Sequence, residues 1–525
     1  IWMADVTGDG LGDLLIGRQN ASPDGTRVGI GALTILVGGQ SLRTFAAGLT
    51  ALDLADPPMG VTMFTLIGDQ PFDRLGIWMR TGDVDGDGID DIAVGADNVD
   101  SDTESNRGAV YVIRGGEHLN ANATVDLADF GGTSLAGKIA RVIPPAGSSG
   151  YHFGSTTQIA DMDGNGRAEV MACAALSRAG ATIGISHNGV QFGGAFVSGS
   201  GGSARGTLYI VWDDNFPVGD WPAGYQVDLE SPPGTTTLID GGANNRAFGE
   251  EMIGGFDLDG DGRSELVAGD LTAFLPGQAN IGSAHVFMNA AGLKGLSFDV
   301  DSPPAGLRIS LIHGTLAGSI TGDTVAAGDV DGDGLDDLAV GNPHDHPQGR
   351  LNAGSVHVLY GQQTGWPAVV DLSLGNLPPS ETLRIARIDG ARGRAGGNEG
   401  DVLCYSLAVG DMNADGHPDL IVNEMVGDGV EAAAEDVGNL LLVSGAALLP
   451  PPPRIQNLGL ASGGADVQFE FLTISGKMYQ LQSRETFGAG QWSDIGAPMA
   501  GVGGLRMATF AIGSDTKRFY RVVEQ

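Results

Sequence analysis

The sequence predicts an all-β protein built from repeated units. Three observations lead to this prediction: glycine makes up 87 of the 525 residues, aromatic residues make up only 6%, and one acidic segment of nine residues returns six times. Abundant glycine and few aromatic residues suit short strands joined by tight turns better than long helices. A segment that returns along a long chain is typical of an architecture in which each repeat is one supersecondary unit.

The repeated segment returns every 72 to 96 residues and carries oxygen-bearing side chains at its first, third, fifth and ninth positions. Its copies begin at Asp5 (DVTGDGLGD), Asp83 (DVDGDGIDD), Asp161 (DMDGNGRAE), Asp257 (DLDGDGRSE), Asp329 (DVDGDGLDD) and Asp411 (DMNADGHPD). Glycine, usual at the fourth and sixth positions, allows the backbone to turn sharply. Because Ca²⁺ takes roughly six to eight oxygen ligands, a tight loop that aims alternate side chains inward suits this ion.

We therefore predict that each loop binds Ca²⁺, giving up to six ions, through positions 1, 3, 5 and 9 and the backbone carbonyl of position 7. The predicted ligands are Asp5, Thr7, Asp9, Leu11, Asp13, Asp83, Asp85, Asp87, Ile89, Asp91, Asp161, Asp163, Asn165, Arg167, Glu169, Asp257, Asp259, Asp261, Arg263, Glu265, Asp329, Asp331, Asp333, Leu335, Asp337, Asp411, Asn413, Asp415, His417 and Asp419. The loops at Asp83, Asp257 and Asp329 carry the most carboxylates and should bind most tightly. The last loop, with Ala414 at the usual glycine position, should be the weakest.

Two other interpretations of these loops are less consistent with the sequence. An EF-hand closes with a glutamate at position 12 and lies between two helices. Here position 12 is Val94 in the second loop and Val340 in the fifth, and the flanking segments are short and β-branched. A solvated Asp-Gly turn would explain one copy, but six copies in step favour metal binding.

Each loop lies inside a larger unit of four predicted strands. A short strand with an FG-like pair precedes it (Phe153-Gly154, Phe248-Gly249, and Leu75-Gly76 as a variant), and an apolar strand follows it. A glycine-led strand such as GAVYVIRGG comes next, and segments such as ATVDLADF, YQVDLESP and VVDLSLG are predicted as the fourth strand. A four-stranded meander leaves edges and faces uncovered, and radial packing of such blades covers them.

This combination, over residues 1–447, resembles the FG-GAP repeats of the integrin α-subunit β-propeller and of related bacterial surface proteins. The resemblance implies a calcium-binding β-propeller of four-stranded blades on a secreted or cell-surface protein. Six repeats are visible, whereas the family usually has seven blades. We expect the chain to begin inside a repeat, so that residues before Ile1 complete a seventh blade, or six blades close with a strand from elsewhere, such as a neighbouring subunit.

The last part of the chain is predicted to form a second domain. Residues 448–454 contain the run Pro450 to Pro453, which favours a stiff polyproline linker. Residues 455–525 contain short alternating segments (ADVQFEF, KMYQLQS, RMATFAI, RFYRVVEQ) that predict a small β-sandwich. This piece is similar to the fibronectin-type or immunoglobulin-like modules that end many secreted bacterial proteins.

Composition limits the classes of partner. Acidic residues outnumber basic ones by 64 to 28, which excludes nucleic acid as an expected partner because phosphate binding needs a basic surface. No apolar run reaches the ~18 residues of a membrane-spanning helix, so we expect no transmembrane segment, and the first residues do not show the pattern expected of a signal peptide. The two cysteines, Cys173 and Cys404, are expected to be free buried thiols.

The order of the strands also predicts two functional ends of each blade. The metal loops join strands 1 and 2, so the variable connections between strands 2 and 3 lie at the other end, where partner contacts are expected. These connections are Arg18–Ile30, Asp97–Arg107, Leu176–Arg205, Asp270–Ile281, Asn342–Ala353 and Glu424–Val437. Among them, the run His344-Asp345-His346 suggests either a metal cluster or, as we favour, solvated loop residues.

We therefore expect a non-enzymatic, extracellular adhesion or recognition protein whose partner is a protein or a glycan. One alternative is a structural subunit that assembles with itself in a cell-surface layer or filament. Another is an extracellular hydrolase. Against the hydrolase, the sequence contains neither a G-x-S-x-G nucleophile elbow nor an H-E-x-x-H zinc pair.

Overall fold

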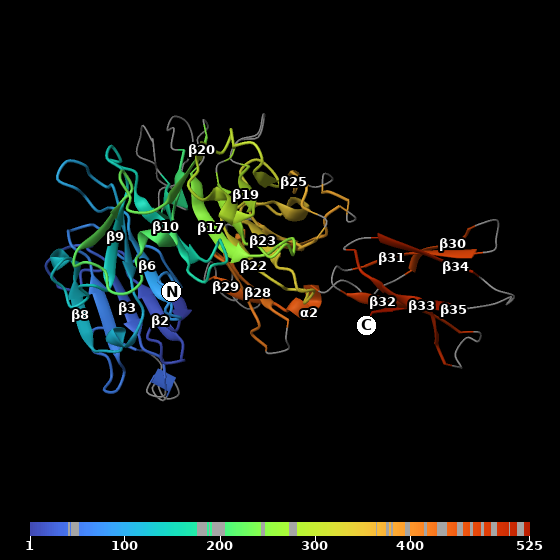
Figure 1. The fold of residues 1–525 in the computed structure, drawn as a ribbon, viewed down its shortest axis with the longest axis horizontal. Coiled ribbons are helices and arrows are strands. Elements are labelled where there is room, and N and C mark those ends of the chain that lie inside the picture. Colours follow the sequence, from blue (N-terminus) through green and yellow to red (C-terminus); the bar gives the residue numbers. More distant parts are fainter. Residues whose placement is uncertain are drawn as a thin grey trace. The chain divides into compact units, whose positions relative to one another are not determined.

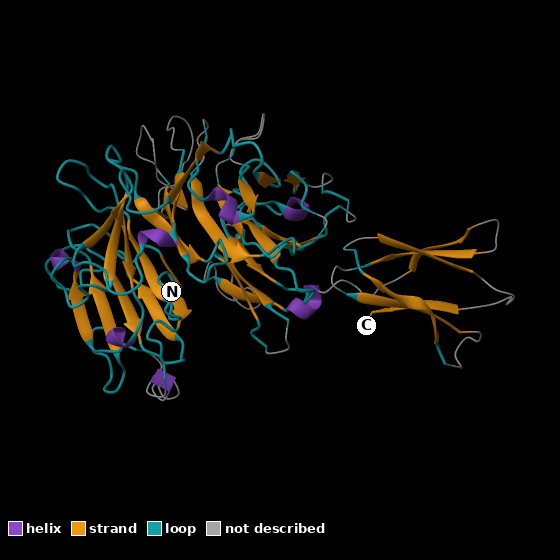
Figure 2. Ribbon diagram, in the orientation of Figure 1, coloured by secondary structure: helices purple, strands orange, loops and turns teal. Residues whose placement is uncertain are grey.

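The computed structural model is almost entirely β-sheet, and Figure 2 shows that its few helices are short. It describes residues 1–39, 42–43, 52–175, 186–187, 190–191, 205–242, 247–271, 273, 281–363, 365–373, 377–379, 382–393, 400–413, 417–427, 438–448, 455–461, 466–473, 477–484, 491–502, 505–511 and 519–524. The chain divides into two compact units: Ile1–Gly255 with Arg263–Ile309, and Phe256–Gly262 with Ser310–Gln525. Within the described residues, no helix is both long and apolar enough to cross a membrane.

The first unit contains three five-stranded sheets (Figure 1). In sheet order, the first consists of β1 (Trp2–Ala4), β2 (Asp13–Gly17), β3 (Ala32–Leu36), β4 (Met63–Ile67) and β8 (Ala123–Asp126). The second consists of β5 (Met79–Gly82), β6 (Asp91–Ala96), β7 (Ala109–Ile113), β9 (Ile139–Ile143) and β15 (Tyr225–Asp228). The third consists of β10 (Phe153–Ala160), β11 (Glu169–Ala174), β14 (Thr207–Val211), β16 (Thr236–Asp240) and β20 (Ser297–Asp299). A further meander begins with β17 (Phe248–Phe256), β18 (Glu265–Asp270) and β19 (Ser283–Met288), and the two-stranded hairpin β12 (Ser186–His187) with β13 (Val190–Gln191) stands apart.

The central strand of each of these sheets (β3, β7 and β14) is buried along its whole length, as are β6 and β11. Every residue of β6 (DIAVGA) and of β7 (AVYVI) is buried, which explains why these segments are nearly continuous runs of small and β-branched apolar residues. Such runs, rather than an alternation of apolar and polar residues, are what a strand buried on both faces requires. The predicted four-stranded meanders are therefore confirmed as blades whose two faces both pack.

The segments predicted as fourth strands hold a different place in the structure. The segment ATVDLADF contains β8, which follows β7 in the chain but pairs in parallel with β4 of the preceding sheet, with Phe64 opposite Ala123. The fourth strand of the second sheet is instead β9, which pairs antiparallel with β7. The parallel pairs β15 with β9 and β25 (Val369–Asp371) with β21 (Arg308–His313) repeat this arrangement. The assignment made from sequence was wrong because a short V-D-L segment looks the same in a parallel fifth strand as in an antiparallel fourth.

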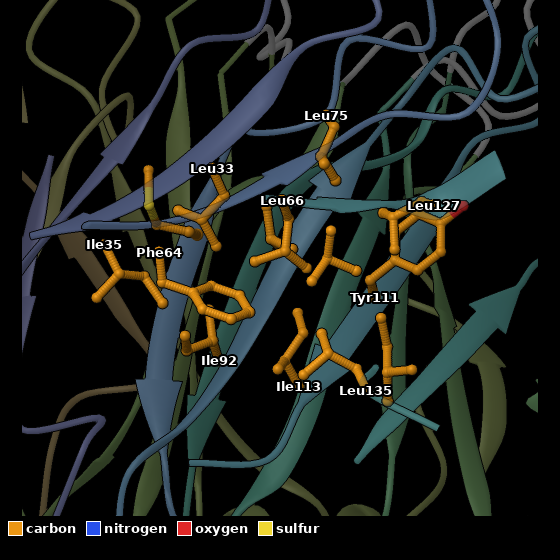
Figure 3. Packing of buried hydrophobic residues seen from close by; sticks show 14 of the residues in the cluster. Leu33, Ile35, Phe64, Leu66, Leu75, Ile92, Tyr111, Ile113, Leu127 and Leu135 are labelled. Atoms are coloured by element: carbon orange, nitrogen blue, oxygen red, sulfur yellow. The ribbon is translucent and has the colours of Figure 1, made fainter. Parts of the chain in front are cut away.

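Neighbouring sheets of the first unit pack face to face. One apolar cluster joins Leu33, Ile35 and Phe64 of the first sheet to Ile92 and Tyr111 of the second (Figure 3). A second cluster joins the second sheet to the third, and a third cluster joins the third sheet to the β17–β19 meander. This is the sheet-on-sheet packing that propeller blades use to cover their faces.

The second unit contains two further meanders and the C-terminal sheets. Its strands are β21 (Arg308–His313, which begins in the first unit) paired with β25 (Val369–Asp371), then β22 (Val325–Gly328), β23 (Asp337–Asn342), β24 (Ser355–Leu359) and β26 (Ile385–Asp389), and then β27 (Leu403–Gly410), β28 (Asp419–Glu424) and β29 (Asn439–Val443). The short helix α2 (Gly445–Leu448) follows β29. The cluster of Val356, Val358, Leu420 and Val422 joins the last two meanders.

The C-terminal part forms two three-stranded sheets. One consists of β30 (Ile455–Ala461), β31 (Asp466–Leu472) and β34 (Leu505–Ala511), and the other of β33 (Ser493–Ala500), β32 (Met478–Arg484) and β35 (Phe519–Glu524). Phe469 and Phe471 of the first sheet share a core with Tyr479 and Leu481 of the second. The predicted fold class, all-β blades followed by a small β-sandwich, is confirmed. The domain boundaries at 447 and 455 remain predictions.

Candidate metal centres

The six acidic loops all join the first strand of a meander to its second strand. They connect β1 to β2, β5 to β6, β10 to β11, β17 to β18, β22 to β23 and β27 to β28. Residues 414–416 of the last loop, which include Asp415, lie outside the described residues. Each sheet therefore presents its acidic loop at one end and its connection between strands 2 and 3 at the other, as the order of the strands predicted.

The first aspartate shapes the turn in the five loops that the structure describes in full. In the first loop, Asp5 Oδ1 accepts hydrogen bonds from the amides of Gly8 at 2.8 Å and Asp9 at 3.2 Å, and Asp5 Oδ2 accepts one from Gly10 at 2.7 Å. Asp83 and Asp161 hold the same three amides of their own loops. Gly8 and Gly10 have φ angles of 74° and 82°, the left-handed region that glycine adopts most readily.

The ninth residue ties the loop to the third strand in the first, second, fifth and sixth loops. In the second loop, the buried Asp91 accepts hydrogen bonds from Val84 N at 2.9 Å through Oδ2 and from Gly115 N at 2.8 Å through Oδ1. Gly115 lies just past the third strand, so one carboxylate joins the loop to the end of that strand. Asp13, Asp337 and Asp419 make equivalent pairs of bonds. This structural role of position 9 was not predicted from the sequence.

Four loops bring three carboxylates together. The ligand atoms of each group lie within 4.8 Å of one another, and the groups are Asp83, Asp85 and Asp91; Asp161, Asp163 and Glu169; Asp257, Asp259 and Asp261; and Asp329, Asp331 and Asp333. Position 9 belongs to the group in the second and third loops, and position 5 in the fourth and fifth. In the described residues, the first loop, which has Thr7 at position 3, and the sixth loop form no such group.

The donor atoms of these groups fit a hard divalent cation. All of them are carboxylate oxygens, which suit Ca²⁺ or Mg²⁺ rather than zinc or copper. In the third loop, Asp163 Oδ1 and Glu169 Oε1 are buried and have no hydrogen-bond partner within the protein. A buried oxygen without a donor is costly unless another partner satisfies it. Asp163 and Glu169 belong to one acidic group with Asp161, so a cation bound by this group would offer both oxygens a partner.

Burial makes several loop carboxylates hard to ionise in the metal-free protein. Burial raises the pKa of Asp91 to about 7, that of Asp333 to about 7 and that of Glu169 to about 8. The negative charge of Asp85 adds to the effect at Asp91, and that of Asp331 adds to it at Asp333. The buried Asp337 shifts in the same direction, again mainly because of burial. A bound cation would favour the ionised forms.

These pKa shifts predict a pH dependence for the metal-free protein. An unfolded carboxyl titrates near pH ~4, so above pH ~6.5 the unfolded chain has released these protons while the folded chain still binds some of them. The free energy of unfolding should therefore fall as pH rises from about 6.5 to about 8.5, by up to about 1.4 kcal/mol per pH unit for each group still protonated. His357 opposes this trend only at the lower end of the window. Burial lowers its pKa to about 4 in the folded protein, and an unfolded histidine titrates at pH ~6.5, so most of its effect on stability falls below this window.

Urea unfolding in calcium-free buffer at several pH values measures this slope. In saturating calcium the slope should flatten or reverse, because the ion must displace the protons to bind. If the free energy of unfolding without metal rises with pH over the same window, the assignment of these carboxyls as protonated is wrong.

Adjacent loops also pack on each other. The side chain at position 7 of one loop lies over the glycine at position 4 of the preceding loop, in the pairs Ile89 on Gly8, Arg167 on Gly86, Leu335 on Gly260 and His417 on Gly332. The amide at position 8 also donates to the carbonyl at position 1 of the preceding loop, from Ala168 to Asp83 at 2.6 Å and from Asp336 to Asp257 at 3.0 Å. Position 7 was predicted only as a carbonyl ligand, and its packing role is new.

This packing predicts unequal effects for two glycine substitutions in one loop. A Cβ on Gly8 would lie 2.6 Å from Ile89 Cδ1, whereas a Cβ on Gly10 would meet nothing within 4 Å. Both glycines have positive φ, so both alanine variants carry similar backbone strain. We expect Gly8→Ala to be less stable than Gly10→Ala by about 1 kcal/mol, since overpacking adds to the strain. Chemical unfolding of the two variants measures the difference. Adding Ile89→Ala to Gly8→Ala should remove the clash and recover the lost stability. Equal stabilities of the two single variants would contradict the contact between Ile89 and Gly8.

Basic side chains reach three of the acidic groups. Arg114 Nε pairs with Asp85, and Arg114 Nη2 lies 3.2 Å from Asp87 Oδ2. Arg384 Nη2 pairs with Asp331, and Lys294 Nζ lies 3.1 Å from Asp163 Oδ2. These partners come from parts of the chain outside the loops they contact, and no motif in the sequence marked them.

At the other end of the sheets, the run His344-Asp345-His346 does not form a metal cluster. His344 Nε2 pairs with Tyr405 Oη at 3.0 Å, and His346 Nδ1 accepts a hydrogen bond from the amide of Asn352 at 3.0 Å. Asp345 is buried and accepts hydrogen bonds from Ser355 Oγ at 2.6 Å and from Arg387. The interpretation of this run as solvated loop residues was wrong for Asp345, because its carboxylate anchors the loop from inside.

The remaining sequence predictions have mixed outcomes. Cys173 and Cys404 are free and buried, as predicted, and burial raises the pKa of both thiols. The connection Leu176–Arg205 lies outside the described residues except for Arg205 and the short hairpin β12–β13. Parts of the connections Asp270–Ile281 and Glu424–Val437 also lie outside them.

Comparison with known proteins agrees with the architecture of the loops and sheets. The FG-GAP repeat family matches residues 76–113 and 321–359, and each match runs from the strand before an acidic loop to the end of the third strand. This chain contains FG-GAP repeats. The two matched FG-GAP repeats contain the second and the fifth acidic loop. In both of these loops an arginine contacts the carboxylate at position 3.

Three relatives of this FG-GAP chain carry the same name, phosphatidylinositol-glycan-specific phospholipase D. The protein from Bos taurus is 28% identical over 170 residues, which is 32% of this chain and 17% of the bovine protein. The protein from Homo sapiens is 32% identical over 136 residues, and that from Mus musculus is 34% identical over 130 residues; each match covers 24% of this chain and 14% of the relative. The chain thus matches less than a fifth of the length of each of these relatives.

Proposed function

We propose that this chain is a calcium-binding recognition module of an extracellular or cell-surface protein, and that it binds a protein or glycan partner. The observation that carries the proposal is the convergence of three carboxylates in each of four loops placed at equivalent ends of successive sheets. Oxygen-only donor sets of this kind suit Ca²⁺, which is abundant outside cells and is bound there at ~10⁻⁴ to 10⁻³ M by many extracellular modules.

The proposed calcium ligands are the oxygen side chains at positions 1, 3, 5 and 9 of each loop. In the third loop these include Asp161, Asp163 and Glu169, whose oxygens converge. A bound ion would supply positive charge that allows neighbouring carboxylates to ionise side by side, and the loop would supply its fixed turn. We propose up to six such sites along the chain.

Partner binding is proposed at the opposite end of the sheets, in the connections between strands 2 and 3. Loops held on a rigid sheet scaffold are where binding residues usually lie. The connection Asn342–Ala353 is anchored from inside by Asp345, so this loop can present its outer side chains in a fixed arrangement. Glycan and protein arrays, probed in calcium and again in chelator, test the proposal. Binding to neither array in calcium would contradict it.

A second candidate function is hydrolysis. The names of the matched relatives are those of an enzyme, so the expectation of a non-enzymatic protein is not confirmed. Incubating the chain with a phosphatidylinositol-glycan-anchored protein and measuring release of the anchor distinguishes the two functions. Release that depends on the chain would establish the hydrolase, and tight partner binding without release would support the recognition module.

A further inference from the structure

We propose that Arg114 and Arg384 are resident counter-cations of the second and fifth acidic loops, which hold these loops in place without metal and lower their affinity for calcium. The proposal rests on the calcium binding proposed above and concerns how two of its sites are regulated. It reverses the order of affinities expected from sequence, since these two loops carry the most carboxylates and were expected to be among the tightest.

The second loop shows the arrangement most fully. Arg114 follows strand β7, and its side chain is only 8% exposed. Its Nε contacts Asp85 Oδ2, its Nη2 lies 3.2 Å from Asp87 Oδ2, and its Nη1 lies 3.3 Å from Asp220 Oδ1. One guanidinium thus bridges positions 3 and 5 of the loop, which are two of the proposed calcium ligands.

Both oxygens of Asp85 are already engaged. Oδ2 is held by Arg114, and Oδ1 accepts a hydrogen bond from the amide of Asp87 at 3.1 Å. The Asp85 side chain is fully buried, so water does not share these oxygens. A cation can bind Asp85 at full strength only if one of these two contacts is given up.

The fifth loop repeats this arrangement with an arginine from a different strand. Arg384 immediately precedes β26, and its Nη2 contacts Asp331 Oδ2. Asp331 Oδ1 accepts a hydrogen bond from the amide of Asp333 at 3.1 Å, and the Asp331 side chain is fully buried. The Arg384 guanidinium also lies over the ring of Tyr360, 3.5 Å from its centroid, which fixes the side chain at the loop.

The third loop provides a contrast inside the same chain. Lys294 Nζ lies 3.1 Å from Asp163 Oδ2, but Asp163 Oδ1 has no hydrogen-bond partner. The Lys294 side chain is 35% exposed, so water screens its charge more than that of Arg114, which is 8% exposed. At position 3, the third loop keeps one carboxylate oxygen free for a cation, whereas in the second and fifth loops both oxygens of this carboxylate are engaged.

Two effects of the arginines follow from simple electrostatics. Without metal, a guanidinium among clustered carboxylates offsets their repulsion and satisfies buried oxygens. With metal, the same positive charge repels the ion across a short distance in a poorly solvated site. The loops therefore stay folded at low calcium and fill only at higher calcium than their carboxylate count indicates.

The test compares the wild-type chain with Arg114→Gln, Arg384→Gln and the double variant. Calcium titration by calorimetry gives the affinities, and melting in chelator gives the stability without metal. We expect two sites of the double variant to bind at least about tenfold more tightly, the size of effect that one charge commonly has on a close ionisable group. We also expect its melting temperature in chelator to fall. Arg107→Gln removes an arginine that pairs with Glu104, outside the loops, and controls for net charge.

The outcomes separate this inference from the proposed function. If the wild-type chain binds no calcium, the proposed function fails. If it binds calcium and the arginine variants bind equally or more weakly, the arginines position the ligands and the inference is overturned. Should the glutamine variants not fold in chelator, Arg114→Lys and Arg384→Lys keep the charge but lose the forked contact, so they should bind calcium at least as tightly as the wild-type chain. Weaker binding in both lysine variants would also overturn the inference.

Discussion

Saturating calcium should raise the melting temperature of this chain by well over ten degrees relative to chelator. Each ion that binds only the folded state adds about 2.7 kcal/mol to its stability when the ion is present at 100 times its dissociation constant, and up to six sites are proposed. The metal-free loops hold clustered carboxylates whose repulsion the ions remove. Differential scanning calorimetry with and without chelator measures the effect.

Asp163→Asn is the variant that isolates one site. Asp163 belongs to the acidic group of the third loop, and its Oδ1 has no partner in the protein, so the amide should weaken calcium binding with little effect on the metal-free protein. Its melting temperature should fall in calcium and stay close to wild type in chelator. Asp102→Asn, an exposed residue outside the acidic groups, is the control for loss of one charge. Identical melting of the wild-type chain in calcium and in chelator would refute calcium binding altogether.

The aspartates at position 3 of the second and fifth loops cannot isolate a calcium site in the way that Asp163 can. From the sequence alone, Asp85→Ala and Asp331→Ala are expected to act only when metal is present, because these residues belong to metal loops. Asp85→Ala removes one of the three carboxylates that contact the buried Arg114, and Asp331→Ala removes the carboxylate that pairs with the half-buried Arg384. Both variants should therefore lose stability in chelator as well.

Features that depend on local spacing could be predicted from the sequence. The spacing of aspartates within each loop predicted that they converge, because a turn of nine residues with glycine at positions 4 and 6 leaves few other directions for its side chains. The alternation of short apolar segments and glycine-rich turns predicted the meanders and the C-terminal sheets. These features depend on residues close together in the chain.

Features that depend on distant segments could not be predicted in this way. Arg384 reaches Asp331 from 53 positions away, and nothing in its own neighbourhood distinguishes it from a solvent-exposed arginine. The parallel pairing of β8 with β4 depends on the preceding repeat, so the segment ATVDLADF alone cannot show it. The packing of Ile89 over Gly8 likewise requires two repeats to be placed side by side.

Position 9 of the loops should prove more important for stability than positions 3 and 5, whether or not calcium is present. Asp91 is buried and accepts hydrogen bonds from Val84 N, which follows the first strand of the meander, and from Gly115 N, which follows the third. Asp91→Ala leaves both amides without their acceptor and opens a small cavity. Each unsatisfied buried amide costs about 1–3 kcal/mol, so a loss of about 3–5 kcal/mol is expected in chelator and in calcium alike.

Asp87→Ala is the matched comparison within the same loop. The Asp87 side chain is 34% exposed and makes no bond to a strand; its oxygens contact the amide of Ile89 and Arg114. We expect this variant to lose less than about 1 kcal/mol in chelator, as partly exposed ion pairs usually do, and to lose more in calcium. Urea unfolding of the two variants in both conditions gives four free energies. If Asp91→Ala loses stability only in calcium, position 9 acts as a metal ligand alone, and its role as the bond between loop and sheet is wrong.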